Sequence, residues 1–178
     1  MKQETLNETL ISIQNGNESA FDALYDNSKD ILFYNILSIV KDRSLAEDLL
    51  QDTYLKILHN IHSYKANSNP IAWMLTIARN LSFNEYKRRK KDVFFDNDHQ
   101  DNLLGSTHND SIEQNPLIHT MYQVLKPKEI ELIVLHVING LNHKEIAKIV
   151  KRPLGTVLWQ YQKALKKLKE RIGEKNET

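Results

Sequence analysis

The chain has 178 residues, no cysteine and a formal net charge of +1. Without cysteine, neither disulfides nor thiolate metal sites can form, which is typical of proteins in a reducing cytosol. The polar N-terminus lacks the apolar core of a secretion signal, and no apolar run approaches the ~20 residues of a membrane helix. We therefore expect a soluble cytoplasmic protein with no membrane insertion, long enough for one large or two small domains.

The small net charge hides four segments of strongly opposed charge. Residues 1–61 carry five Lys/Arg against ten Asp/Glu, and residues 92–115 carry six acids and no Lys or Arg. Residues 79–91 carry six Lys/Arg against one Glu, and residues 144–171 carry nine against two. A single basic run is usually a solvated face, but two runs separated by acidic sequence indicate two sites that meet phosphate.

The secondary structure is expected to be entirely helical. Only five Gly and four Pro occur, and no segment shows the β-branched alternation typical of a strand. The first helix should run from Thr5 to Gln14 and end at Gly16 as its C′ residue. Asn17 should cap a second helix. The buried residues of that helix would be Phe21, Leu24, Ile31, Leu32, Ile36 and Val40.

The third helix should combine an apolar stripe with an acidic face. Ser44 and Glu47 have the spacing of a capping box, which predicts a helix from Leu45 to about Ile61. Its stripe contains Ala46, Leu49, Leu50, Tyr54, Ile57 and Leu58. Its acidic, hydrogen-bonding surface consists of Glu47, Asp48, Gln51 and Asp52. This surface would suit a basic, Arg-rich helical partner, although a solvated helix face has the same composition.

A polar loop over residues 63–69 should separate the third helix from a fourth. Asn69 is expected to cap the fourth helix and Pro70 to occupy its first position, and the helix should run to about Lys91. Trp73 on this helix has apolar neighbours in sequence, so we expect it in the core rather than stacked on a ligand.

The second half of the chain begins after a segment with linker composition. Residues 92–115 are rich in Asp, Asn, Ser and His, and they predict a flexible acidic linker between two domains. Pro116 and Pro127 should each open a helix, and the second of these should end near Gly140. The residues that this second helix should bury are Ile130, Ile133, Val134 and Val137.

Residues 142–171 have the pattern of two helices joined by a tight turn. Asn142 and Glu145 form a capping box, and Pro153 suits the first position of the second helix. The first helix would bury Ile146, Ala147, Ile149 and Val150. The second would bury Leu154, Val157, Leu158, Tyr161, Leu165, Leu168 and Ile172.

The opposite side of this last helix is cationic, and it carries Thr156, Trp159, Gln160, Lys163, Lys166 and Lys167. Two helices joined in this way can place the second one in a DNA major groove, where Gln can pair with adenine and Lys with guanine. The nearby cations Lys144, Lys148, Lys151 and Arg152 are better suited to backbone phosphates. A plain αα-hairpin with a solvated basic face would show the same pattern.

Four strings, in order along the chain, resemble the extracytoplasmic-function (ECF) sigma factors of bacterial RNA polymerase, within the sigma-70 family. They are Ala20–Tyr25, Ala46–Tyr54, Ala72–Leu81 with the basic run from Lys87, and Leu141–Ala147 with Gly155–Val157. The resemblance covers nearly the whole chain. It implies an N-terminal helical domain over residues 1–91 (sigma region 2, for the polymerase clamp and the −10 element). It also implies a helix-turn-helix domain over residues 116–178 (sigma region 4, for the −35 element).

The resemblance also implies a role for each surface. The protein would direct core RNA polymerase to promoters and melt them, without catalytic activity, cofactor or metal. The acidic surface of the third helix would bind the clamp of the β′ subunit, and the C-terminal domain would bind the flap of the β subunit. Contacts to the −10 element, including a flipped base held by the loop at 63–69, would come from Tyr64, Asn67, Arg79, Asn80, Lys87, Arg88 and Lys91. Contacts to the −35 element would come from Lys151, Arg152, Thr156, Trp159, Gln160 and Lys163. An anti-sigma protein, commonly membrane-anchored, would be a further partner.

The chain departs from the family pattern at positions that read DNA. Many members have Ser and then Arg where Trp159 and Gln160 stand, and Arg where Lys163 stands. Asn84 and Glu85 replace a usual Asp and the basic residue after it. We therefore expect an unusual promoter sequence and do not transfer the family's consensus.

Two other hypotheses remain open at this point. The chain could be a stand-alone helix-turn-helix regulator that binds a symmetric operator without polymerase, or a helical adaptor that binds only protein. An enzyme finds little support, because the sequence has no P-loop, no Gly-rich dinucleotide turn and no nucleophile elbow. His59 and His62 share a helical spacing, but without further ligands they do not predict a zinc site.

Overall fold

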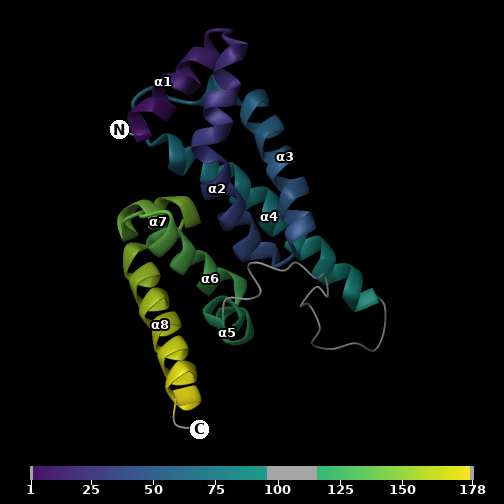
Figure 1. Ribbon diagram of the computed structural model, residues 1–178, viewed down its shortest axis with the longest axis vertical. Coiled ribbons are helices and arrows are strands. Elements are labelled where there is room, and N and C mark those ends of the chain that lie inside the picture. Colours follow the sequence, from purple (N-terminus) through teal and green to yellow (C-terminus); the bar gives the residue numbers. More distant parts are fainter. Residues whose placement is uncertain (1, 96–115, 177–178) are drawn as a thin grey trace.

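The computed structural model describes residues 2–95 and 116–176, and the side chains of residues 4–90 and 119–173. Within these ranges the chain forms helices and no strand, arranged as two helical domains (Figure 1). The prediction of an all-α protein with two domains is confirmed. The last helix of the N-terminal domain runs four residues farther than predicted, because residues 92–95 continue it, and the other residues of the predicted linker lie outside the described range.

The N-terminal domain contains four α-helices and two short 3-10 turns. They are α1 (Lys2–Gln14), η1 (Glu18–Ala20), α2 (Phe21–Val40), α3 (Arg43–His59), η2 (Ile61–Ser63) and α4 (Pro70–Phe95). Helices α2, α3 and α4 pack against one another, and α1 lies against α2 and α4. The fully buried side chains at their centre include Leu24, Leu32, Ile36, Ile57 and Leu75.

The C-terminal domain contains four α-helices and one π-helical turn. They are α5 (Pro116–Val124), α6 (Pro127–Ile133), η3 (Val134–Ile138), α7 (His143–Val150) and α8 (Leu154–Asn176). Helix α8 packs against α5, α6 and α7, and its buried stripe consists of Val157, Tyr161, Ala164 and Leu168. Pro116 and Pro127 open α5 and α6, as expected.

Several predicted helix ends are confirmed by their hydrogen bonds. Gly16 has a φ of +92°, and the bonds of its N–H and of the next N–H close a Schellman motif at the end of α1. The Asn69 side chain accepts the N–H of Ala72 at 2.9 Å at the start of α4. Asn142 and Glu145 form the predicted capping box of α7.

Other predicted ends are wrong because a neighbouring residue competes better. Asp42, and not Ser44, caps α3, since its carboxylate accepts the N–H of Leu45 at 3.1 Å and starts the helix earlier. Glu47 instead pairs with Arg43 one turn before it, at 3.0 Å. Asn17 precedes the 3-10 turn η1 and not α2, and it makes no side-chain cap bond, since its side chain binds the hydroxyls of Ser12 and Ser19. Pro153 precedes α8 rather than opening it.

Most predicted core residues are buried or half-buried, but three are exposed. Val137 is 62% exposed because it lies in the π-helical turn η3, whose wider spacing rotates it off the 3.6-residue stripe. Leu158 is exposed because it lies about 100° around α8 from the buried Val157. Ile172 is also exposed, beyond the last buried residue of the α8 stripe, Leu168.

The two domains pack directly against each other. Helix α6 and turn η3 contact α2, and α7 contacts α4 (Figure 1). Polar contacts between described residues cross this boundary. They are an Arg79–Glu131 ion pair at 2.7 Å, a bond from Asn69 to Glu145 at 2.9 Å, and a bond from the Lys41 amine to the Tyr122 carbonyl at 3.0 Å. At this boundary α7 therefore covers the start of α4.

Candidate nucleic-acid and protein interfaces

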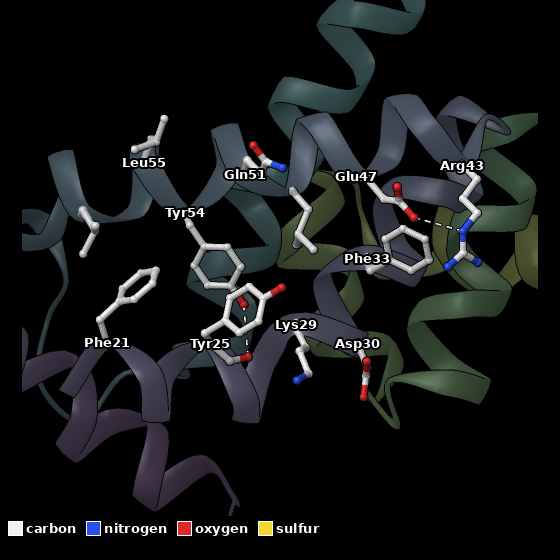
Figure 2. Close-up of a pocket in the computed structure, with 12 residues that line it drawn as sticks. Phe21, Tyr25, Lys29, Asp30, Phe33, Arg43, Glu47, Gln51, Tyr54 and Leu55 are labelled. Atoms are coloured by element: carbon white, nitrogen blue, oxygen red, sulfur yellow. Dashed lines mark hydrogen bonds and ion pairs between the residues drawn. The ribbon is translucent and has the colours of Figure 1, made fainter. Parts of the chain in front are cut away.

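An aromatic groove lies between α2 and α3 of the N-terminal domain (Figure 2). Its floor is the ring of Tyr54, which is almost fully buried. Phe21 and Tyr25, one turn apart on α2, place their ring centroids 5.7 and 5.1 Å from that ring. The Tyr54 hydroxyl lies 2.8 Å from Ser28 Oγ, and burial raises the pKa of Tyr54 well above its usual value. The floor is therefore neutral and fixed.

The rim of this groove is charged and amphipathic. Leu55, at 67% exposed, and Leu58 extend the apolar surface along α3. Glu47 and Gln51 line the groove on the α3 side, whereas Lys29 and Asp30 line it on the α2 side. Asp48 and Asp52 are exposed on the same helix. An apolar floor with an acidic α3 edge is suited to an amphipathic, basic helix.

Sequence reasoning found the acidic edge of this groove but missed its apolar floor. The missed residues are Phe21, Tyr25, Phe33, Tyr54 and Leu55. One signal was present, since Leu55 interrupts the polar face of α3 at a position where the apolar stripe does not fall.

The loop between η2 and α4 is held from below by Asn7 of α1. Tyr64 is only 3% exposed, its hydroxyl donates to Asn7 Oδ1 at 2.7 Å, and its ring lies 5.2 Å from Trp73. The same Asn7 oxygen accepts the N–H of Asn67, which has a φ of +62°. Tyr64 thus packs in the core with Trp73, while Asn67 is exposed. Asn7 was not expected from the sequence.

The first basic residue of α4 points toward the other domain. Arg79 pairs with Glu131 of α6 at 2.7 Å, and its guanidinium lies 4.7 Å from the Phe83 ring. The Glu131 side chain is 1% exposed. Burial raises the pKa of Glu131 to about 7, and the charges of Arg79 and Arg152 oppose that rise. In this arrangement Arg79 joins the domains, and only its neighbour Asn80 is exposed.

The later basic residues of α4 are exposed, but two of them share one carboxylate. Arg88 makes two bonds to Glu85, at 2.8 and 2.9 Å, and Arg89 reaches both Glu85 and Asp42 at 3.1 Å. The bond from Arg88 lowers the pKa of Glu85, so that this carboxylate stays charged. Lys87 is exposed, and the side chain of Lys91 lies outside the described residues.

The outer face of α8 is open to solvent. Thr156, Trp159 and Lys163 are exposed, with Trp159 at 61%, and the Lys163 amine lies 4.9 Å from the Trp159 ring. Lys167, expected on this face, instead binds Glu129 of α6 at 2.6 Å. Gln160 is half-buried, and its amide oxygen accepts a bond from Arg152 at 2.6 Å.

The turn that leads into α8 is rigid. Lys151 has a φ of +54°, and the N–H groups of Lys151 and Arg152 bond the carbonyls of Lys148 and Ala147, which closes a Schellman motif at the end of α7. The buried Val157 and Tyr161 then fix the rotation of α8 about its axis. The exposed face of α8 is therefore presented in one orientation.

Two further properties concern the described part of the chain. No helix within residues 2–95 or 116–176 combines the length and apolar character that a bilayer span needs. The described side chains also form no cluster of three or more His, Cys, Asp or Glu that could hold a metal ion.

Comparison with known proteins identifies the family to which the chain belongs. Residues 24–92 match the family Sigma-70 region 2, and residues 117–168 match the family Sigma-70, region 4. The chain is 30% identical over 161 residues to the ECF RNA polymerase sigma factor SigM of Bacillus subtilis (strain 168). That match covers 84% of this chain and 95% of SigM. The chain belongs to the ECF sigma factors.

Other relatives agree with this assignment. The ECF RNA polymerase sigma factor SigX of Bacillus subtilis (strain 168) is 27% identical over 164 residues, which cover 87% of this chain and 84% of SigX. Among solved structures, the sigma factor RpoE in complex with the anti-sigma factor NepR from Bartonella quintana matches with a TM-score of 0.73. It has 24% identity and covers 86% of this chain and 96% of that chain. CnrH in complex with the cytosolic domain of CnrY matches with a TM-score of 0.71, 18% identity and coverage of 96% and 98%. These two structures have the same fold as this ECF sigma factor, which functions in transcription initiation.

In this ECF sigma factor, the residues predicted for the −10 element differ in their exposure to solvent. Asn67, Asn80, Lys87 and Arg88 are exposed, whereas Tyr64 is in the core and Arg79 lies at the domain boundary. The residues predicted for the −35 element lie close together, at the start and outer face of α8 and in the turn before it.

Proposed function

We propose that this ECF sigma factor binds core RNA polymerase through the groove between α2 and α3, and reads promoter DNA with α4 and α8. Residues 1–91 would form the polymerase and −10 domain, and residues 116–178 the −35 domain. Such a factor has no chemistry of its own and acts in the cytoplasm, where the polymerase transcribes.

The observation that carries this proposal is the groove itself. A fixed apolar floor (Tyr54, Phe21 and Tyr25) lies beside an acidic edge (Glu47, Asp48, Gln51 and Asp52), and the edge is exposed along one helix. Apolar surface of this kind is rarely left open on one face of a small domain without a partner. A helical, Arg-rich segment of the β′ clamp would fill the floor with its apolar side and pair with the acidic edge.

The DNA contacts are supported by exposure and charge. On α8, Thr156, Trp159 and Lys163 are the exposed candidates for base contacts, and Lys151 is suited to phosphate. On the N-terminal domain, the exposed candidates are Asn67, Asn80, Lys87 and Arg88, with Lys91 following on the same helix. We assign Tyr64 a supporting role, since Asn7 and Trp73 hold it beneath the loop.

The packed arrangement of the two domains adds a condition. Asn69, just before α4, and Arg79, on α4, are bound by Glu145 and Glu131 of the C-terminal domain, so the α4 surface is only partly open. Promoter binding through Arg79 would require the C-terminal domain to move away. Two structural neighbours were solved with anti-sigma factors, RpoE with NepR and CnrH with CnrY. An anti-sigma protein that holds the domains together or covers the groove is therefore our proposed regulator.

The test is reconstitution with bacterial core RNA polymerase. We expect the full chain to co-purify with core enzyme and to give promoter-dependent run-off transcripts. Leu55→Glu, at the exposed rim of the groove, should reduce core binding at least tenfold. Ile172→Glu places the same charge at an exposed apolar site outside the proposed interfaces and should leave binding unchanged.

Two outcomes would contradict this proposal. If the wild-type chain gives no promoter-dependent transcript with core enzyme, the role in promoter recognition fails. If the isolated chain protects a symmetric site without polymerase, the stand-alone regulator is favoured instead. Equal core binding by both variants would reject the groove as the polymerase site while leaving transcription itself in place.

A further inference from the structure

The contact between Arg152 and Gln160 bears on which base α8 reads. Arg152 lies in the turn before α8 and Gln160 lies on the second turn of that helix, and the guanidinium Nη1 donates to Gln160 Oε1 at 2.6 Å. Both side chains are half-buried, and the backbone on each side is fixed by the Schellman turn and by the packing of Val157 and Tyr161. The Arg152–Gln160 contact therefore has a defined geometry at the start of α8.

The chemistry of this contact fixes the orientation of the Gln160 amide. A guanidinium has only N–H donors, so the atom of Gln160 that meets it must be the oxygen. With Oε1 turned back toward the α7–α8 turn, the amide NH₂ is the group directed away from the protein. Gln160 then offers donors and no acceptor to a base edge.

This orientation conflicts with the usual use of Gln in a major groove. Pairing with adenine requires the amide to present its oxygen to N6–H₂ and its NH₂ to N7 side by side, and an amide whose oxygen is turned back toward Arg152 does not present both. A donor-only group matches an edge that presents acceptors, and guanine presents both N7 and O6 there. The neighbouring exposed cation, Lys163, is likewise a donor only.

We infer that Arg152 is a positioning residue that makes Gln160 select guanine rather than adenine at the base pair it contacts. This inference rests on the proposed function, since it needs α8 in the major groove. It replaces the sequence-based expectations that Gln160 pairs with adenine and that Arg152 serves mainly as a phosphate contact. Arg152 acts through Gln160, and its own guanidinium need not touch a base.

The experiment uses holoenzyme assembled from the full chain and bacterial core RNA polymerase. The template library is randomised across the upstream promoter element, and sequences are read from both retained DNA and transcripts. The base pair read by Gln160 is identified as the position whose preference is lost in Gln160→Ala. At that position the wild-type protein should enrich guanine over adenine by about tenfold, the discrimination expected of one good base contact.

Two variants then separate positioning from simple loss of charge. Arg152→Met removes the bond but keeps side-chain bulk, and it should shift the preference at that position toward adenine by about tenfold. Lys151→Asn removes a charge from the same turn, with a residue that tolerates positive φ. It should weaken all sequences about equally and leave the preference unchanged. In the Gln160→Ala background, Arg152→Met should no longer alter the preference.

Several results would overturn the inference. It fails if the wild-type protein prefers adenine at this position, if Arg152→Met leaves the preference as it was, or if Arg152→Met changes it equally without Gln160. It also fails if Gln160→Ala flattens no position while the wild-type holoenzyme transcribes normally. A wild-type chain that supports no promoter-dependent transcription would reject the proposed function instead, so the two failures are distinguishable.

Discussion

The two basic helices of this protein are presented in opposite ways. On α8 the outer face is open, with Trp159 and Lys163 directed to solvent. On α4 the first basic residue, Arg79, is turned inward and paired with the buried Glu131 of the other domain. A basic residue thus serves as a surface cation in one domain and as an interdomain contact in the other. Cationic sequence alone does not tell which of these roles a residue has.

The largest expected effect comes from removing Arg79. Arg79→Met leaves Glu131 buried without its partner, and this should lower the free energy of unfolding by about 2 kcal/mol at pH 8. It should also separate the domains. Because the chain has no cysteine, two introduced cysteines at the exposed positions Ser44 and Gln162 can carry labels for a distance measurement.

The matched control for that experiment is the double variant Arg79→Met/Glu131→Leu. It replaces the ion pair with apolar side chains and should regain most of the lost stability and the short label distance. An Arg79→Met protein as stable and as compact as wild type would show that the ion pair does not hold the domains together.

The second prediction concerns the pH dependence of stability, which we expect to arise from the buried Glu131 at the domain boundary and not from the open face of α8. Burial raises the pKa of Glu131 from 4.5 to about 7 in the packed protein, so the packed state binds the proton more tightly than the unfolded chain does. The contribution of Glu131 to stability is therefore present at low pH. It should decrease as the pH rises from about 4.5 to about 7, and remain constant above that.

Unfolding by urea across this pH range measures the effect. Glu131→Gln keeps a polar partner for Arg79 but cannot titrate, so the pH dependence of the variant should lack this component. Identical pH profiles for variant and wild type would mean that Glu131 stays ionised in the packed state.

The third prediction concerns the loop that precedes α4. Asn7→Ala removes the acceptor of the Asn67 N–H and the nearer of the two acceptors of the buried Tyr64 hydroxyl, leaving the Ser68 carbonyl at 3.2 Å, and should cost about 1 kcal/mol of stability. Promoter opening, followed by permanganate reactivity of unpaired thymines, should fall more than promoter binding does. Asn7→Asp keeps an acceptor oxygen and should restore both properties, and a failure to do so would argue against this role of the Asn7 oxygen.

The smallest expected effect on the protein itself is on the open face of α8. Lys163→Ala should leave the free energy of unfolding within about 0.5 kcal/mol of wild type. It should nevertheless weaken promoter binding and reduce the salt dependence of binding by about one counterion. The control is Lys169→Ala, which removes an exposed cation farther along the helix and should change promoter binding and its salt dependence less than Lys163→Ala does. A large loss of stability in Lys163→Ala would show that Lys163 makes structural contacts and that the outer face of α8 is not open.

The sequence predicted most of what depends on neighbouring residues, except the caps assigned to Ser44 and Asn17, and it missed what depends on distant ones. Gly16, Asn69 and the Asn142–Glu145 pair ended or began helices as expected, because capping is decided within a few residues. The apolar stripes likewise follow from helical spacing. The exposure of Val137 was not predictable in this way, because a π-helical turn changes that spacing locally.

The candidate sites divide along the same line. The acidic edge of α3 follows from a single helix, but the groove beside it requires Phe21 and Tyr25 of α2 to meet Tyr54 of α3. The inward turn of Arg79 depends on Glu131, which lies 52 positions later and in another domain. Similarly, the orientation of Gln160 depends on one bond across a turn. Apart from the apolar Leu55 on the polar face of α3, residue type and spacing carry no signal for such contacts.

The bond between Tyr54 and Ser28 also has a kinetic consequence for the groove. Since it holds the central ring in place before any partner arrives, docking there need not wait for that ring to be rearranged, and little ordering entropy is lost on it. The time that the factor stays on the polymerase would then be governed by the dissociation rate, which the looser side chains such as Leu55 adjust. Sigma factors that compete for a limited pool of core enzyme could differ in residence time through such rim positions alone.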